Sequence, residues 1–356
     1  MSNLKRLQER LVTEDLDGLL LFDENNIRWL GGFHISDGAA LVTHESCFLF
    51  TDSRYIEAAE AALPKEITPL LCSGQSPVMK QISDRVAEKG ARRLGIEDDK
   101  INLRLYLSLK EKLDAELLEK GALMSSLRSI KSEDELRSLE AAQDISELAF
   151  FEIIKRIKPG VSEFDIAAEL SYQMLKFGAE GNSFPPICLV GKRCSLPHGV
   201  PSEAKAESGQ FILMDFGCVK NGYCSDMTRT IALGGVSEEM ELIYNTVLRA
   251  QNAGLEKIRA GVSGAEVHDA AADVIEKAGF GQYFGHGFGH GVGLDIHEDP
   301  RVSPANKDPL PAGAVVSAEP GIYIPDKIGV RIENVVYITE DGYKPITKLG
   351  TELMII

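Results

Sequence analysis

A glycine-rich segment near residue 290 combines histidines with a bare backbone. It reads FGHGFGHGVGLDIHE over residues 284–298, with glycine at alternate positions. In an extended chain successive side chains point to opposite faces, so His286 and His290 would share one face and the other would carry only hydrogens. Two strand residues four apart are separated by roughly 13 Å, so in regular geometry both histidines cannot bind the same metal ion. One histidine is therefore expected to be a metal ligand and the other to reach a substrate. His297 is another substrate-facing candidate, too far along for the same ion unless the chain folds back.

Two aspartates lie in a segment that is typical of a β-hairpin, FILMDFGCVKNGYCSDMTRT, with Asn221-Gly222 as its turn signal. A turn there would place Asp226 one diagonal step from Asp215, and a turn one residue earlier would place the two directly opposite. Both registers put the carboxylates on one face, where they repel each other and where apolar neighbours add a desolvation cost. A shared divalent cation would remove the repulsion. The alternative is one aspartate in the turn and one paired with Arg229.

Two glutamates lie among apolar residues that favour β-strands. Glu319 occurs in AVVSAEPGIYI and Glu333 in GVRIENVVYI, and glutamate is almost never fully buried without a partner. Either one alone could form a salt bridge with the nearby Arg331. Four carboxylates with one imidazole suit Mn²⁺, Co²⁺ or Fe²⁺ better than structural zinc, which favours Cys and His ligands. The negative charge of four carboxylates also exceeds what one divalent ion needs for neutrality. The sequence therefore predicts two metal ions, an arrangement that usually serves hydrolysis.

The elements that must position these residues follow from periodicity. The first third alternates short apolar runs with helical patterns, which is typical of a small α/β domain. A boundary is predicted near 125–132, where Ser132-x-x-Glu135 forms a capping box before a long amphipathic helix. Strands are expected through every segment that holds a candidate ligand. Because strands and helices are mixed without strict alternation, the remainder is predicted to be an antiparallel α+β domain, with further helices over 163–177, 238–259 and 264–277. The last of these helices is expected to open with the capping box Ser263-x-x-Glu266.

Composition excludes several classes of function. The chain of 356 residues is 44% hydrophobic and 26% charged, as expected of a globular protein, and its net charge of −16 argues against a nucleic-acid partner. No apolar run approaches the ~20 residues of a membrane span, and the charged N-terminus lacks the features of a signal peptide. Six cysteines without a CxxC pair indicate reduced thiols. We therefore expect a cytoplasmic protein without membrane or nucleic-acid partners.

Five ordered motifs resemble the M24 metallopeptidase family of prolidase, aminopeptidase P and methionine aminopeptidase. They are LPHG (196–199), DFG…SDMTRT, GHGVGLDIHE, AEPGIYIP and GVRIEN. The resemblance implies an α+β chain in which a pita-bread metallopeptidase domain over residues 129–356 follows a smaller α/β N-terminal domain of the creatinase/prolidase type over residues 1–128. Methionine aminopeptidases generally lack such an N-terminal domain, which makes them the weaker candidate.

The resemblance also implies a role for each matched residue. Five residues would bind the two metals: Asp215, Asp226, His290, Glu319 and Glu333. Asp226 and Glu333 would bridge the ions, with Asp215 on one and His290 and Glu319 on the other. Glu319 would also relay a proton to the leaving nitrogen. Three histidines would act on the substrate. His297 would stabilise the tetrahedral intermediate, and His198 and His286 would line the substrate pocket.

The implied activity is hydrolysis of Xaa-Pro bonds in short proline-containing peptides by a homodimer. The two divalent ions would be Mn²⁺ or Co²⁺, with Fe²⁺ and Zn²⁺ as alternatives. Competing functions are an Xaa-Pro aminopeptidase for longer peptides, a metal-free creatinase-like hydrolase and a non-catalytic binding module; the presence of all five presumed ligands argues against the last two.

A strict dipeptidase must recognise the free carboxylate of a C-terminal proline, and an arginine is the natural device. Arg301 and Arg331 are the candidate substrate-binding cations, and they favour the dipeptidase. The alternative is that Arg331 pairs with a ligand carboxylate and that Arg301 is solvated.

Overall fold

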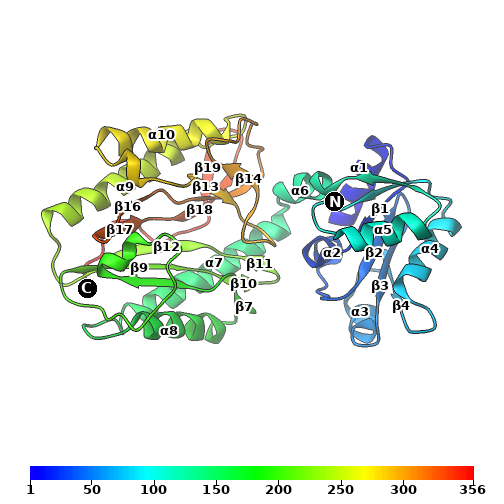
Figure 1. Ribbon diagram of the computed structural model, residues 1–356, viewed down its shortest axis with the longest axis horizontal. Helices are drawn as coiled ribbons and strands as arrows, with labels where there is room; N and C mark the ends of the chain where they lie inside the picture. Colours follow the sequence, from blue (N-terminus) through cyan, green and yellow to red (C-terminus); the bar gives the residue numbers. More distant parts are fainter. The chain divides into compact units, whose positions relative to one another are not determined.

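The computed structural model describes residues 1–356, which form two compact units, Met1–Arg128 and Ser129–Ile356 (Figure 1). None of its helices combines the length and the apolar character that crossing a membrane requires.

The first unit is built on one six-stranded sheet in the order β4-β3-β2-β1-β5-β6. β1 runs parallel to β5 and antiparallel to β2, so the sheet is mixed. The expectation of short strands from apolar runs is confirmed at β1, β2, β3 and β5. β4 and β6 were not expected from the sequence; β4 has one buried residue, Ile67, and β6 has none. The strands are β1 Gly18–Leu21, β2 Ala39–Thr43, β3 Cys47–Thr51, β4 Ile67–Leu71, β5 Arg93–Ile96 and β6 Glu116–Glu119. The helices are α1 Asn3–Thr13, α2 Glu24–Gly31, α3 Ile56–Ala62, α4 Val78–Glu88, α5 Leu103–Lys112 and α6 Gly121–Ser129.

In the second unit two helix pairs enclose the strands (Figure 1). One apolar cluster joins α7 and α8 to one face of β9 and β12, and a second joins α9 and α10 to the other face and to the later strands. Ile212 and Met214 belong to the first cluster, and Phe211 and Leu213 to the second. Burial of β9 on both faces explains its continuous apolar run.

The helices of this unit are α7 Glu133–Ile153, α8 Glu163–Lys176, η1 Gly191–Ser195, α9 Glu238–Lys257, α10 Gly264–Lys277 and η2 Gly281–Tyr283. The earlier strands are β7 Gly181–Asn182, β8 Ile187–Val190, β9 Gln210–Phe216, β10 Cys218–Lys220, β11 Tyr223–Cys224 and β12 Met227–Leu233. The later strands are β13 Gly289–Gly291, β14 Glu298–Val302, β15 Val315–Ala318, β16 Gly321–Ile324, β17 Ile328–Arg331, β18 Asn334–Ile338 and β19 Tyr343–Pro345.

Capping chemistry sets where these helices begin, as the sequence predicts. The side chain of Ser132 accepts from the backbone of Glu135, whose carboxylate accepts from the backbone of Ser132. The same reciprocal pair opens α10 at Ser263 and Glu266. Each box satisfies donors that a helix start leaves without partners within the helix.

The aspartate hairpin turns at Asn221-Gly222, which is the register predicted to place the two aspartates one diagonal step apart. Both residues have positive φ, 50° and 83°, as a type I′ turn requires. β12 then pairs with β9 so that Thr228 lies opposite Asp215. Asp226, two residues before Thr228, is therefore one diagonal step from Asp215 rather than directly opposite.

The expectation of continuous strands through the ligand segments holds for Asp215, which lies within β9, and is wrong for Asp226, Glu319 and Glu333. β15 ends one residue before Glu319, and β18 begins one residue after Glu333. Pro320 has no N–H to donate, which helps to end the ladder at Glu319. Around the two histidines only Gly289–Gly291 form a strand, so His286 lies outside the strand that carries His290.

The bare backbone of the glycine-rich segment serves close packing between strands. β13 lies between β14 and β15. A Cβ on Gly289 would lie 2.0 Å from the carbonyl oxygen of Ser317, and one on Gly291 would lie 2.4 Å from that of Asp299. A Cβ on Gly285, by contrast, would meet nothing within 4 Å.

Gly289→Ala should therefore lower the free energy of unfolding by about 1–3 kcal/mol or more, because backbone must move to admit the methyl group. The matched change Gly285→Ala should stay within about 0.5 kcal/mol of the parent. Denaturant unfolding of both variants measures the difference. Equal stability of the two would contradict the close approach at Gly289.

Candidate active site

All the side chains singled out from the sequence line one cavity of about 510 Å³ in the second unit. They come from segments far apart in the chain, which the fold brings together: His198, Asp215, Asp226, His286, His290, His297, Arg301, Glu319, Arg331 and Glu333.

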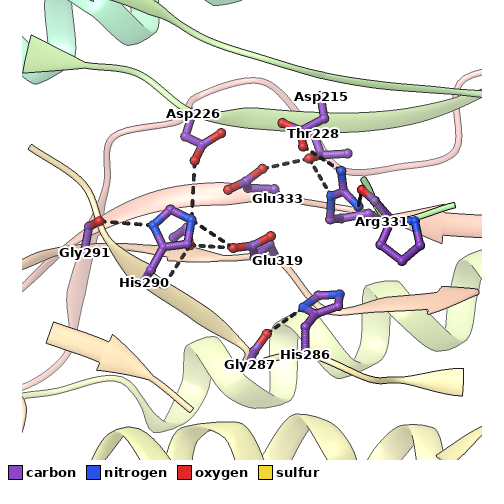
Figure 2. Close-up of polar contacts among 12 residues, drawn as sticks. Asp215, Asp226, Thr228, His286, Gly287, His290, Gly291, Glu319, Arg331 and Glu333 are labelled. Carbon is purple, nitrogen blue, oxygen red and sulfur yellow. Dashed lines mark hydrogen bonds and ion pairs between the residues drawn. The ribbon is translucent and has the colours of Figure 1, made fainter. Parts of the chain in front are cut away.

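Four carboxylates and one imidazole converge within this cavity (Figure 2). One ligand atom from each of Asp226, His290 and Glu333 lies within 4.8 Å of the others. His290 Nε2 lies 3.6 Å from Asp226 Oδ2 and 3.1 Å from Glu319 Oε1. This spacing is compatible with a cation held among oxygen and nitrogen ligands.

Buried carboxylate oxygens without hydrogen bonds support the same interpretation. Asp215 Oδ1 and Glu333 Oε1 are both buried and accept no hydrogen bond. Burial raises the pKa of Asp226 and Glu333 well above the usual range, and the charges of the neighbouring carboxylates raise both pKa values further. Burial also raises the pKa of Asp215, although the charge of Arg331 opposes this effect. A divalent cation would relieve the repulsion and supply the missing partner.

The imidazole of His290 is oriented to present Nε2 to the carboxylates. Its Nδ1 lies 3.1 Å from the carbonyl oxygen of Gly291, to which it can only donate. Burial opposes the charged forms of His290 and Glu319, but their mutual interaction raises the pKa of His290 and brings the pKa of Glu319 to about 2. A metal ion would take the place of the proton on Nε2, because histidine binds metals in its neutral form.

Ser317 ties these two residues together. Its hydroxyl donates to Glu319 Oε1 at 3.1 Å and accepts from the backbone N–H of His290 at 3.0 Å. One side chain thus couples β15 to β13 at the point where the candidate ligands emerge.

Arg331 is a buried cation behind the carboxylates. Its Nη2 lies 2.6 Å from Asp215 Oδ2. The same guanidinium donates to the hydroxyls of Thr228 and Tyr323 at 3.0 and 2.8 Å, and Thr228 in turn donates to Glu333 Oε2 at 2.7 Å. This geometry favours the alternative interpretation of Arg331, in which it pairs with a ligand carboxylate.

The other histidines are arranged around this cluster. His286 Nε2 lies 3.0 Å from the hydroxyl of Tyr323, and burial lowers the pKa of His286. The chain folds back between residues 293 and 297, so that the ring of His297 lies 4.3 Å from that of His290, between centroids. His198 and Arg301 are exposed at the cavity wall.

Three polar partners were not identified from the sequence: Thr228, Ser317 and Tyr323. A signal was present, because Thr228 is two residues from Asp226 and Ser317 is two from Glu319. Strand alternation puts such residues on the face of the ligand. An apolar wall of the cavity was also not identified, although the apolar run FPPI at residues 184–187 was a signal for it. The wall is formed by Phe184, Pro185, Pro186, Ile187, Val200, Pro201 and Ile296.

Comparison with known proteins identifies the family. Residues 137–340 match metallopeptidase family M24, and residues 3–130 match the creatinase/prolidase N-terminal domain. An Xaa-Pro dipeptidase of Pyrococcus horikoshii is 35% identical over 99% of this chain and 98% of its own length. The chain belongs to metallopeptidase family M24, and the expected fold class is confirmed.

Solved structures give the same result. An Xaa-Pro dipeptidase from Bacillus anthracis is 39% identical with a TM-score of 0.94, and 99% of each chain is covered. An X-Pro aminopeptidase from Thermotoga maritima is 33% identical with a TM-score of 0.91, and the match covers 98% of this chain and 100% of that chain. Both kinds of activity therefore occur among proteins similar to this chain.

His290→Ala and His286→Ala should differ in metal content. His290 Nε2 faces two carboxylates, whereas His286 Nε2 faces a phenol, so only the first change should deplete the metal. His286→Ala should retain the metal and lose activity. Metal analysis of the dialysed proteins distinguishes the two, and equal depletion in both would show that the ligand was wrongly assigned.

Proposed function

We propose that this chain is a dinuclear metal-dependent hydrolase of Xaa-Pro bonds, acting mainly as a dipeptidase. The observation that carries the proposal is the convergence of five potential metal ligands in one cavity, with carboxylate oxygens that have no other partner. The similarity to Xaa-Pro dipeptidases over the full length of the chain supports the choice of substrate.

In this proposal five residues would hold the ions: Asp226 and Glu333 would be shared by both, Asp215 would hold one of them, and His290 with Glu319 would hold the other. Mn²⁺ or Co²⁺ are the proposed ions, because carboxylate-rich sites with one imidazole favour them over structural zinc. The bound ions would supply a nucleophilic water near neutral pH and polarise the scissile carbonyl.

The side chains around the ions would complete the reaction. Glu319 would pass a proton to the leaving nitrogen. His297 lies beside His290, where it can donate to the carbonyl oxygen as charge develops there. His198 and His286 would line the substrate pocket, and the apolar wall near Pro185 offers a surface for the proline ring.

The dipeptidase assignment depends on a cation for the proline carboxylate. Arg301 is exposed on β14 and lines the cavity, whereas Arg331 is buried against Asp215. Arg301 is therefore the better of the two candidates. Xaa-Pro aminopeptidase activity is the second candidate, favoured by the similarity to the enzyme of Thermotoga maritima.

We further propose that the protein is a cytoplasmic homodimer acting on short proline-containing peptides, with domains over residues 1–128 and 129–356. All six cysteines are buried free thiols, as expected in a reducing compartment. Neither a metal-free creatinase-like hydrolase nor a binding module requires all five ligand residues, so both are disfavoured.

Arg301→Ala should raise KM for an Xaa-Pro dipeptide by ~10- to 100-fold, which corresponds to loss of one charge-assisted contact. The parent should cleave Xaa-Pro dipeptides far better than longer Xaa-Pro peptides. Steady-state kinetics on both substrate lengths tests this. Efficient cleavage of a tripeptide, unchanged by Arg301→Ala, would assign the chain as an aminopeptidase.

Glu333→Gln should abolish activity and lower metal content together, because it removes a proposed bridging ligand. Asp269→Asn, which changes an exposed acid on α10, is the matched control and should leave both unchanged. Activity and metal-to-protein ratio are measured on the same preparations. Full activity with two bound ions in Glu333→Gln would refute the dinuclear assignment.

A further inference from the structure

A buried glutamine on α9 touches the backbone of both glutamate ligands. Gln251 is fully buried, and its Nε2 donates to the carbonyl oxygen of Ala318 at 2.9 Å and to that of Ile332 at 3.0 Å. Both partners are acceptors only, so the nitrogen of the amide must face them. These two carbonyls belong to the peptide units that lead directly into Glu319 and Glu333.

The same two peptide units are also held at their N–H ends. The N–H of Glu319 donates to the carbonyl of Phe288 at 2.8 Å, and the N–H of Glu333 donates to the carbonyl of Thr228 at 3.1 Å. Each peptide plane is thus fixed on both sides. Because the plane is rigid, fixing it also fixes where the Cα of each glutamate lies and limits the directions its side chain can take.

The amide stands where the sheet can no longer provide partners. The ladder between β15 and β18 ends with Ala318 opposite Asn334. Glu319 and Glu333 are the next residue on each side, just beyond the end of that ladder. Beyond it the strands break, and buried carbonyls there would lack donors. The two hydrogens of the Gln251 amide supply one donor to the carbonyl of Ala318, at the end of β15, and one to that of Ile332, between β17 and β18.

The helix that carries Gln251 is itself seated against the site. Gly254 lies one turn further along α9, against Phe288. A Cβ at this position would be 2.3 Å from the ring of Phe288, so only glycine fits. That contact allows α9 to approach Phe288, whose carbonyl accepts from Glu319. One face of α9 therefore supports the Glu319 peptide unit at both ends: Gln251 binds its carbonyl oxygen, and Gly254 packs against Phe288, which accepts from its N–H.

We propose that Gln251 is a positioning residue for the metal centre, which sets the separation of the Glu319 and Glu333 carboxylates through their backbones. The inference rests on the proposed function, because it assumes that both glutamates bind metal. Residues that orient ligands typically contribute 10- to 100-fold to metal affinity. Gln251 should do so without contacting the metal or the substrate.

The test compares metal affinity in matched glutamine variants of the full-length protein. Gln251→Met keeps the length of the side chain and removes both donors. Gln173→Met is the control, since Gln173 is equally buried in the same unit and its amide bonds only to Glu169. Chelator-treated proteins are titrated with Mn²⁺ by calorimetry, and dipeptide hydrolysis is then assayed at rising Mn²⁺.

Gln251→Met should bind Mn²⁺ ~10- to 100-fold more weakly than the parent, whereas Gln173→Met should bind within about threefold of it. Excess Mn²⁺ should partly restore the activity of Gln251→Met, which a merely structural defect would not allow. Gln251→Glu answers the question if the methionine variant does not fold, because a buried protonated carboxyl offers one donor, and its affinity should be intermediate.

Parent-like Mn²⁺ affinity in Gln251→Met or Gln251→Glu would overturn the inference, as would equal weakening in Gln173→Met. A parent protein that binds no Mn²⁺ would instead refute the proposed metal centre on which the inference rests.

Discussion

The second unit is organised around a concentration of buried negative charge. Four carboxylates share one cavity, and only His290 and Arg331 contact them as cations. Like charges in a desolvated space oppose folding, so the arrangement persists only where bonding partners hold each carboxylate in place. Arg331 does this for Asp215, and His290 does it for Glu319. Asp226 and Glu333 have no such cation within hydrogen-bonding distance, so a deficit of positive charge remains that favours bound divalent ions.

Three of the four carboxylates lie where strands are interrupted, whereas Asp215 lies within β9. Asp226 lies between β11 and β12, Glu319 between β15 and β16, and Glu333 between β17 and β18. Uninterrupted strands would send their side chains along parallel rows, whereas a break lets side chains from several strands converge on one point. Each break leaves backbone groups without a ladder partner. Buried side chains such as Gln251 then take over the role of the missing strand.

Much of this could be predicted from local sequence, and the limits have physical causes. Capping boxes at Ser132 and Ser263 depend on residues three apart, so they located helix starts correctly. Residue chemistry and the family motifs led to the candidate ligands. Interrupted strands and the fold-back before His297 could not be predicted, because they depend on which strands pair over long distances. The contacts of Gln251 join residues 67 and 81 positions apart, and no local pattern encodes them.

The two histidines of the glycine-rich segment show how the environment assigns a role to identical chemistry. Each ring has its Nδ1 against the next residue's carbonyl, Gly291 for His290 and Gly287 for His286. What differs is the atom opposite Nε2. For His290 it is a carboxylate, so the pKa of the imidazole, although lowered by burial, is raised overall by Glu319, and Nε2 faces the place for a cation.

For His286 the atom opposite Nε2 is the hydroxyl of Tyr323. Burial raises the pKa of this phenol to about 12, so it keeps its proton. Because Arg331 already donates to the phenol oxygen, that proton is directed at His286 Nε2. Both nitrogens of His286 are then engaged in the neutral form, which agrees with a pKa lowered by burial. Binding a metal at Nε2 would require breaking that bond, so Tyr323 reserves His286 for the substrate side of the cavity.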